Sequence, residues 1–299
     1  MNGTPCIAAI VIAGSMRPHP GRALRRPYEH RCPPDLDFRL RLGHGPHMAN
    51  NESIDGTTLQ KQAAALAPDE IPAIASLRRI AESNPDRPFV VAQLGQSLDG
   101  RIATPGGESR YINAAAGLDH LHRLRACVDA VVVGAGTIEA DDPELTVRRC
   151  AGRNPARIVV DPRSRLDWGG RWLARDGARR VLVTSNARVA PPGVETVALP
   201  ADSGAIAPHE IILALHRLGF ARILVEGGAR TVSSFIDAGA IDRLHLIVAC
   251  MIIGSGRTGL DLRPLLRLGD ALRPPTEVCR LGERDVLFDC DLRAAAERE

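Results

Sequence analysis

Apolar runs alternate with helical patterns along the chain from Arg87 onward. Short apolar runs that end at turn residues are typical of buried strands, whereas apolar positions repeating every three or four residues are typical of helices. The pattern predicts strands at 89–94, 130–133, 158–160, 181–184, 222–225 and 244–249, and helices at 114–126, 207–218 and 231–238.

The order of these elements predicts the fold class. Strands that alternate with helices form a mostly parallel sheet with helices on both faces. The last stretch, 277–292, has the pattern of two strands joined by a turn at Gly282 and Glu283. We therefore expect an α/β fold with a mostly parallel central sheet, flanking helices and an antiparallel C-terminal hairpin.

Residues 1–86 have a different pattern. The stretch 19–47 is dense in Arg, Pro, His and Gly without a sustained period, which is typical of a loop or a disordered segment. Helical spacing follows over 59–82, with interruptions at Pro68 and Pro72. We expect an N-terminal extension at 1–86, partly disordered with a helical segment, and one domain at 87–299.

A further hypothesis is that translation begins at Met48. The intact mass of the protein from its native host tests this hypothesis, and a species that begins at Met1 would contradict it.

Composition and charge narrow the class of protein. The 299 residues carry a formal net charge of +3, with 44% hydrophobic and 24% charged residues, so neither a general nucleic-acid role nor a membrane role follows. No apolar stretch reaches the roughly 18 residues of a membrane helix. The seven cysteines include no C-x-x-C pair, which argues against a disulfide framework or a structural zinc site. We expect a cytoplasmic protein without a bound metal.

Three predicted strands lead directly into glycine-rich turns, at 134–137, 226–231 and 254–256. Glycine lets backbone amides approach a ligand closely, and a helix that begins after such a turn directs free N–H groups toward an anion. The second turn is the best phosphate cradle because Thr231 and Ser233 add hydroxyl groups. None of the turns has the G-x-G-x-x-G spacing of a dinucleotide fingerprint.

Charged residues lie near the ends of the predicted strands. Glu226 follows a strand at the carboxyl edge of the sheet, where open α/β sheets bind ligands; the alternative is an acid in the first turn of a helix. Arg125 and Arg148 have the planar fork that clamps phosphate, and the alternative is a solvated side chain. The sequence gives no indication of a serine hydrolase, because it contains no G-x-S-x-G motif.

Five motifs follow one another in a specific order. They are Ser97-Leu98-Asp99-Gly100-Arg101-Ile102-Ala103, Gly107-Glu108-Ser109, the segment 128–137, the segment 140–148 and Val225-Glu226-Gly227-Gly228. In this order they resemble the reductase domain of riboflavin biosynthesis, over about residues 87–292. That domain is the second half of a bifunctional deaminase–reductase and also exists alone.

The resemblance implies a dihydrofolate-reductase-like fold, commonly dimeric. It also implies that NADPH reduces the ribosyl group of 5-amino-6-(5-phosphoribosylamino)uracil, or of a close ribosylaminopyrimidine phosphate, with hydride transfer to the sugar C1 carbon. The cofactor carries the redox chemistry and the protein supplies orientation and charge placement. The expected partners are thus a phosphorylated pyrimidine, NADPH and a second copy of the chain.

The resemblance extends to individual residues. The positions that bind substrate in the family are matched by Ser109, Arg125, Leu145, Arg148 and Glu226. The cofactor positions are matched by Gly95, Tyr111, Thr137, Asp141, Gly228, Ala229, Arg230, Thr231, Val232, Ser233 and Ser234. The proton donor stays open; a water molecule held near Glu226 is one candidate, which makes Glu226 the candidate catalytic residue.

Three residues depart from the usual bacterial pattern. Gln93 stands where many members have Lys, Tyr111 where Trp is common, and Pro162 where Ser is common. Two alternatives therefore stay open: a paralogous reductase that acts on another pterin, pyrimidine or carbonyl substrate, and a non-catalytic NADPH-binding protein. The zinc signature of the deaminase half is absent from 1–86, which predicts no zinc and no deaminase activity.

Overall fold

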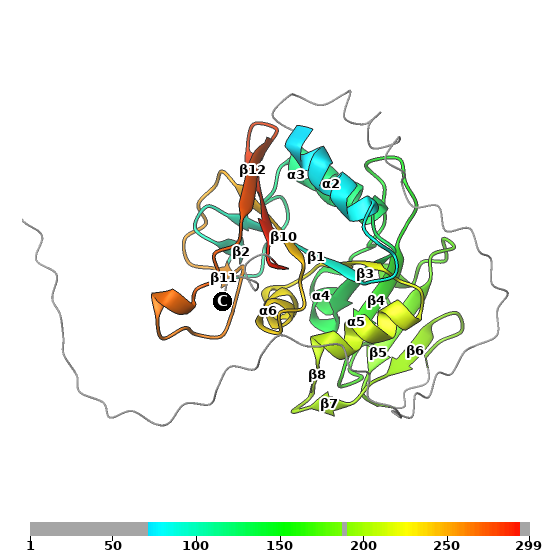
Figure 1. Cartoon of the computed structure of the whole chain (residues 1–299). Coiled ribbons are helices and arrows are strands. Elements are labelled where there is room, and N and C mark those ends of the chain that lie inside the picture. Colours follow the sequence, from blue (N-terminus) through cyan, green and yellow to red (C-terminus); the bar gives the residue numbers. More distant parts are fainter. Residues whose placement is uncertain (1–70, 187–189, 294–299) are drawn as a thin grey trace, which may run out of the picture. The chain divides into compact units, whose positions relative to one another are not determined.

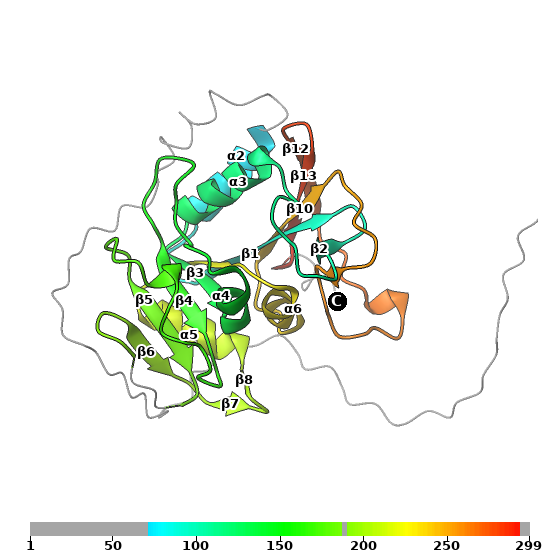
Figure 2. The ribbon, with the colours of Figure 1, turned by 180° about the vertical axis from the view of Figure 1, so that it is seen from behind.

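The computed structural model describes residues 71–186 and 190–293. A nine-stranded sheet runs through this part of the chain in the order β12-β13-β10-β1-β9-β3-β4-β5-β6 (Figure 1 and Figure 2). Its strands are β1 (Phe89–Ser97), β3 (Ala130–Gly134), β4 (Ala156–Val160), β5 (Arg180–Thr184), β6 (Glu195–Ala198), β9 (Arg222–Val225), β10 (Arg243–Ala249), β12 (Thr276–Leu281) and β13 (Asp285–Asp291).

Helices and short ribbons complete the described fold. The helices are α2 (Ile71–Ala81), α3 (Ala115–Ala126), α4 (Ala135–Asp141), α5 (Pro208–Arg217) and α6 (Ala229–Asp237), with 3₁₀ turns η2 (Arg171–Leu173) and η3 (Leu268–Asp270). Two small antiparallel ribbons join β2 (Arg101–Ala103) to β11 (Arg257–Thr258) and β7 (Ala201–Asp202) to β8 (Ala205–Ile206).

The strand directions confirm the predicted fold class. From β10 across to β6, every neighbouring pair of strands is parallel. The C-terminal hairpin is antiparallel, since β13 pairs antiparallel with both β10 and β12. Its turn contains Gly282 at a φ of 62°, a left-handed conformation that glycine adopts without strain.

Both faces of the sheet are buried, as expected for parallel strands. Along β1, Val90 and Ala92 belong to one apolar cluster, while Phe89 and Val91 belong to the other. The first cluster includes side chains of α5 and α6, and the second includes side chains of α2, α3 and α4. The alternation of neighbouring residues between two cores explains why these strands read as continuous apolar runs rather than as alternating ones.

Helix α2 lies within the stretch 59–82, where the sequence predicts helical spacing. Pro72 is the second residue within its described bounds. Leu77 and Ile80 of α2 are fully buried in the same core as Phe89. The expectations for the disordered stretch at 19–47, for Met48 and for the start of the helical pattern at 59–70 lie outside the described residues.

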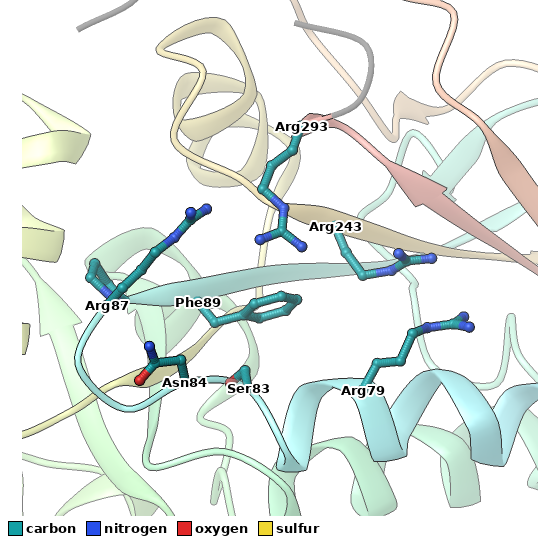
Figure 3. Close-up of a pocket in the computed structure, with 8 residues that line it drawn as sticks. Arg79, Ser83, Asn84, Arg87, Phe89, Arg243 and Arg293 are labelled. Atoms are coloured by element: carbon teal, nitrogen blue, oxygen red, sulfur yellow. The ribbon is translucent and has the colours of Figure 1, made fainter. Parts of the chain in front are cut away.

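The parallel sheet gives the fold two distinct edges. The strands β1, β3, β9 and β10 all have their C-terminal ends on the same side of the sheet, which we call the carboxyl edge. The glycine-rich turns at 134–137, 226–231 and 254–256 follow three of these strands. At the opposite edge, Phe89 and Arg243 begin their strands beside a pocket of about 340 Å³ (Figure 3). In the described part of the chain, no helix is long and apolar enough to cross a membrane.

Candidate functional site

Two helices begin side by side at the carboxyl edge. Helix α4 starts directly after β3, and α6 starts three residues after Glu226, which follows β9. The strands β3 and β9 are neighbours in the sheet. The backbone N–H of Gly228 donates a hydrogen bond of 3.1 Å to Thr137 Oγ1. This bond ties the start of α6 to the first turn of α4.

Glycine is required where the two helix starts meet. Gly227 has a φ of 114°, and a Cβ added there would lie 2.7 Å from Thr137 Oγ1. A Cβ added at Gly134 would lie 2.6 Å from Thr231 Oγ1. The N-cap residue of α6 is Gly228, which has no side chain to cap the helix, so the N–H groups of Ala229 and Arg230 are available to an anion.

The residues predicted for the cofactor fall into different surroundings. Gly228, Ala229, Arg230 and Thr231 form the start of α6, next to Thr137. Within the same helix, Val232 is fully buried in the core, Ser233 Oγ accepts a bond of 2.8 Å from the N–H of Asp261, and Ser234 Oγ donates to the carbonyl of Thr231. The remaining predicted positions lie on other elements: Gly95, Tyr111 and Asp141.

Gly95 lies in β1 where the backbone is crowded. A Cβ at this position would lie 1.8 Å from Asn113 Oδ1, so a side chain here would displace Asn113. Tyr111 is 84% exposed with a φ of 69°. Asp141 is the last residue of α4 and is exposed, at the opposite end of the helix from its start.

Arg125 and Glu226 face each other in a buried, two-bonded ion pair. Arg125 Nε donates to Glu226 Oε1 at 2.7 Å, and Nη2 donates to Oε2 at 2.6 Å. Arg125 Nη1 also donates to the carbonyl of Thr146 at 3.0 Å. Burial by itself lowers the pKa of Arg125, but the Glu226 carboxylate more than offsets burial and raises it. The two side chains hold each other in place through this ion pair.

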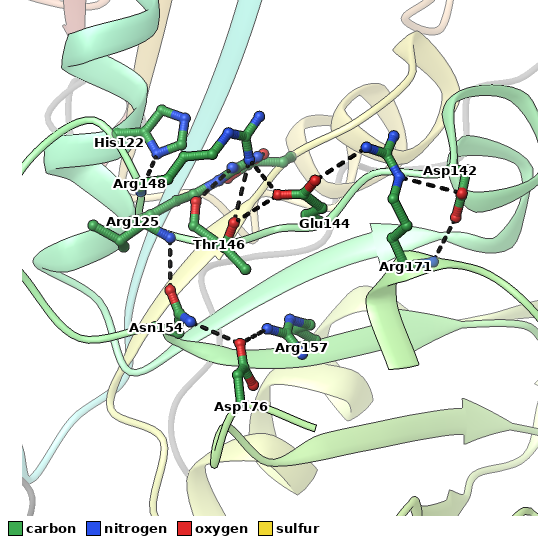
Figure 4. A network of polar contacts seen from close by, with 12 residues as sticks. His122, Arg125, Asp142, Glu144, Thr146, Arg148, Asn154, Arg157, Arg171 and Asp176 are labelled. Carbon is green, nitrogen blue, oxygen red and sulfur yellow. Dashed lines mark hydrogen bonds and ion pairs between the residues drawn. The ribbon is translucent and has the colours of Figure 1, made fainter. Parts of the chain in front are cut away.

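The segment from Asp142 to Arg148 is held in place by polar contacts with several other parts of the chain (Figure 4). Glu144 contacts Arg148 Nη1 and Arg171 Nη1, each at 3.1 Å. The N–H of Val147 donates to Asn154 Oδ1 at 2.7 Å. This segment carries Leu145, which is 2% exposed and has a φ of 56°.

Arg148 is the exposed member of the predicted substrate residues. Its side chain is 55% exposed, while its N–H donates to His122 Nδ1 at 3.1 Å. Burial, followed by the charges of Arg125 and Arg148, lowers the pKa of His122 to about 4. His122 is therefore neutral near pH 7 and accepts this hydrogen bond, which orients the backbone that carries Arg148.

Ser109 lies at a half-buried position in the loop after β2. Among the described residues, no side-chain hydrogen bond joins Ser109 to Arg125 or Glu226, so its role in substrate binding stays a prediction. Gln93 is buried within β1, and the carbonyl of Pro162 accepts a bond of 2.5 Å from Ser185 Oγ.

Asp99 has a clear role that the sequence did not reveal. Its carboxylate accepts bonds from Ser97 Oγ at 2.5 Å and from the N–H groups of Ile253 at 3.1 Å and Gly254 at 2.6 Å. These bonds, that of Ser97 first, lower the pKa of Asp99 to about 2. Asp99 thus ties the glycine turn after β10 to the end of β1.

Asp285 is a second residue that sequence reasoning missed. One of its carboxylate oxygens accepts bonds from the N–H groups of Ala114 at 2.8 Å and Gly117 at 3.2 Å. These donors lie at the start of α3, 168 or more residues away in the chain. Asp285 therefore caps the helix whose other end carries Arg125, and no local signal indicates such a distant cap.

The described residues include five free cysteines, at 127, 150, 250, 279 and 290. Within the described residues, no group of three or more His, Cys, Asp or Glu side chains is arranged to hold a metal ion. The expectation of a protein without zinc stays a prediction.

Comparison with known proteins gives consistent matches over this region. The RibD C-terminal domain family matches residues 88–282. The chain is 34% identical over 195 residues to the 2,5-diamino-6-ribosylamino-4(3H)-pyrimidinone 5′-phosphate reductase of Methanothermobacter thermautotrophicus, covering 62% of this chain and 90% of that protein. It is 31% identical over 210 residues to the riboflavin biosynthesis protein RibD of Aquifex aeolicus, covering 68% of this chain and 58% of that protein.

A solved structure agrees with these matches. The diaminohydroxyphosphoribosylaminopyrimidine deaminase/5-amino-6-(5-phosphoribosylamino)uracil reductase of Thermotoga maritima superposes with a TM-score of 0.61 at 28% identity. The match covers 75% of this chain and 61% of that chain. The chain thus spans about 60% of the length of the A. aeolicus and T. maritima proteins and 90% of the M. thermautotrophicus reductase.

Proposed function

The chain belongs to the RibD C-terminal domain family, and from this membership we propose that it is an NADPH-dependent reductase in riboflavin biosynthesis. Its proposed substrate is a ribosylaminopyrimidine 5′-phosphate, and the ribosyl group is reduced to a ribityl group. The match over 90% of a relative named as a pyrimidinone 5′-phosphate reductase supports this substrate class.

One observation carries the proposal. Glu226, which is held in a buried ion pair by Arg125, directly precedes the glycine turn at the start of α6. A fixed carboxylate at Glu226 and a helix that starts three residues later, at Ala229, suit two ligands bound side by side. The carboxylate suits sugar hydroxyls, and the helix start suits a dinucleotide diphosphate. Such proximity is what a transfer between two bound molecules requires.

The start of α6 fits a dinucleotide cofactor. Gly227 and Gly134 let the backbone approach closely, because any Cβ there would collide with threonine hydroxyls. The N–H groups of Ala229 and Arg230 suit the diphosphate, and the exposed Arg230 side chain suits the 2′-phosphate that distinguishes NADPH from NADH. When bound, the cofactor supplies the hydride that reaches the sugar C1 carbon.

The chain's own residues orient the substrate. Arg148 is exposed and offers its guanidinium to the ribose phosphate, while Ser109 adds a hydroxyl donor. Glu226, held as a carboxylate by Arg125, accepts hydrogen bonds from the sugar or the pyrimidine. A water molecule bound to Glu226 then donates the proton that completes the reduction.

The proposal includes a homodimer in the cytoplasm. Leucines between β11 and β12 support the dimer, because Leu265, Leu266, Leu268 and Leu272 are 58%, 98%, 86% and 52% exposed. Exposed apolar side chains at this density mark an interaction surface. The free thiols of the five described cysteines suit a reducing compartment.

The test is NADPH oxidation, followed at the nicotinamide absorbance, with two substrates in parallel. One is 5-amino-6-(5-phosphoribosylamino)uracil and the other is its diamino-pyrimidinone counterpart. Turnover of either supports the proposal and identifies the substrate. Binding of NADPH without turnover of both would favour a paralogous reductase, and a lack of NADPH binding would contradict the cofactor.

A further inference from the structure

Four arginines line the pocket at the amino edge of the sheet (Figure 3). They are Arg79 from α2, Arg87 just before β1, Arg243 at the start of β10 and Arg293 after β13. Because β1, β9 and β10 are parallel, this pocket lies at the opposite end of the strands from Glu226. It is therefore separate from the proposed reductase site.

Two of the arginines each contact two carboxylates. Arg79 Nη2 contacts Glu277 at 2.9 Å and Asp289 at 3.1 Å. Arg243 contacts Asp289 at 2.7 Å and Asp291 at 3.3 Å. Three carboxylates thus outnumber these two guanidinium groups by one, so this half of the pocket carries one negative charge in excess.

The other two arginines share a single carboxylate. Arg87 Nη2 and Arg293 Nε lie 3.6 and 3.4 Å from the same oxygen of Asp242. Asp242 also accepts a bond of 2.7 Å from the N–H of Val90 with its second oxygen. The side chains of Arg87 and Arg293 are 62% and 37% exposed, so one positive charge in excess faces the pocket from this half.

Two neutral donors lie beside these arginines. Ser83 Oγ is buried and has no hydrogen-bond partner in the described part of the chain. Asn84 Oδ1 accepts a bond of 2.9 Å from the N–H of Asp86, which leaves its NH₂ group as a donor. A buried hydroxyl without a partner is costly unless a ligand or water satisfies it.

The ring of Phe89 fixes one of the guanidinium groups. The Arg293 guanidinium carbon lies 4.9 Å from the centre of the Phe89 ring, and Phe89 is 7% exposed in the core. A planar guanidinium held on an aromatic face loses less freedom when it binds a ligand. Arg293 is therefore preorganised on the pocket side of the ring.

We propose that this half of the pocket binds the phosphate group of a small phosphorylated compound. Arg87, Arg293, Ser83 and Asn84 supply donors, and Asp242 is the one charged acceptor shared by the two arginines. A phosphate accepts bonds from all four donors through its terminal oxygens and neutralises the excess charge, whereas a carboxylate offers only two oxygens. The pocket volume leaves room for a group attached to the phosphate.

Calorimetric titration of the full chain with inorganic phosphate, and separately with adenosine monophosphate, tests the proposal. We expect saturable binding, which Arg87→Gln and Arg293→Gln each weaken by about tenfold, the cost of one charge-assisted hydrogen bond. Tighter binding of the nucleotide would show that the attached group is also held. Equal binding of the two probes would show that the phosphate alone is recognised.

Matched variants separate this pocket from the proposed reductase site. Arg78→Gln removes a neighbouring exposed arginine of α2 that pairs with Glu82 outside the pocket, and phosphate binding stays unchanged. Arg148→Gln also leaves phosphate binding at this pocket intact. Binding that is lost in Arg148→Gln but unchanged in Arg87→Gln would overturn the proposal, whether or not the chain is a reductase.

Folding is controlled with the same proteins. Arg87 is mostly exposed, so Arg87→Gln is expected to melt at the temperature of the unchanged chain in phosphate-free buffer. Arg87→Lys keeps the charge without the planar fork and is expected to bind phosphate with intermediate affinity. Affinity of Arg87→Gln equal to that of the unchanged chain would show that Arg87 takes no part.

Discussion

Arg125 and Glu226 are joined by two hydrogen bonds of 2.7 and 2.6 Å across 101 residues of sequence. Arg125 comes from the end of α3 and Glu226 from the residue after β9. Both are about 6% exposed, so neither charge is satisfied by water. The Glu226 carboxylate therefore has two roles: it neutralises the buried charge of Arg125, and in the proposed reaction it accepts hydrogen bonds from the substrate.

The first prediction concerns Glu226→Gln. The change leaves the buried Arg125 charge without its partner, so we expect a loss of about 3 kcal/mol in the free energy of unfolding. We also expect kcat/KM to fall roughly ten- to hundredfold. Urea unfolding and NADPH oxidation measure the two effects. The control is Glu195→Gln, which disrupts a similar two-bonded pair with Arg179 at the surface and should cost less than about 1 kcal/mol.

Arg148→Gln should separate binding from folding. The side chain is 55% exposed, so the free energy of unfolding should change by less than about 0.5 kcal/mol. KM for the phosphorylated substrate should rise by about tenfold or more, because a charge-assisted contact to phosphate is lost. The neighbouring Arg149→Gln, whose partner is Asp119, should leave KM unchanged. Equal KM values for both variants and the unchanged chain would exclude Arg148 from the site.

Gly227→Ala should disrupt the start of α6. Alanine at a φ of 114° is strained, and its Cβ would lie 2.7 Å from Thr137 Oγ1. We expect a loss of about 2 kcal/mol in stability together with weaker NADPH binding, measured by denaturation and by fluorescence titration. Gly136→Ala is the stability control, since no atom lies within 4 Å of its Cβ, and its helical position should tolerate alanine or gain up to about 1 kcal/mol. Similar stabilities of the two variants would contradict the predicted strain.

Stability should fall as the pH decreases from 7.5 to 5. The pKa of His122 is about 4 in the folded chain and about 6.5 in an unfolded one. Below pH 6.5 the unfolded chain therefore binds more protons, so stability is complete above this pH and is lost toward pH 4. The slope from this residue is at most about 1.4 kcal/mol per pH unit.

His122→Asn tests this pH dependence. Asparagine keeps an oxygen that can accept the bond from the N–H of Arg148 but does not titrate. Urea unfolding at several pH values should show a shallower slope than in the unchanged chain. A slope that stays the same would mean that His122 does not carry the effect.

The homodimer gives a fifth prediction. Replacing Leu266 and Leu268 with serine removes two side chains that are 98% and 86% exposed, so folding should be unaffected. Sedimentation at micromolar concentration should show a dimer for the unchanged chain and a monomer for the double variant. Leu213→Ser, on the half-exposed face of α5, is the control and should remain dimeric. A monomeric unchanged chain would rule out the dimer.

The apolar pattern was sufficient to predict the main strands and helices. A parallel strand that is buried on both faces needs apolar residues at every position. Val131 to Val133 form such an unbroken run, with neighbouring side chains in opposite cores. The edge strand β6 was not predicted, because its residues at 195–198 are mostly half-exposed and carry little apolar signal. The ribbons β2–β11 and β7–β8 are too short to give a periodic pattern.

The sequence by itself determined the chemical groups and the edge of the sheet where they gather. Glycines after β3 and β9 and the carboxylate of Glu226 lie at strand ends, and parallel strands bring such ends to one edge. Only the tertiary structure decided how the groups pair. Arg125 binds Glu226, Asp285 caps α3, and Arg87 shares Asp242 with Arg293. These partners are far apart in the chain, and side-chain pairing over such distances depends on packing, which no local pattern encodes.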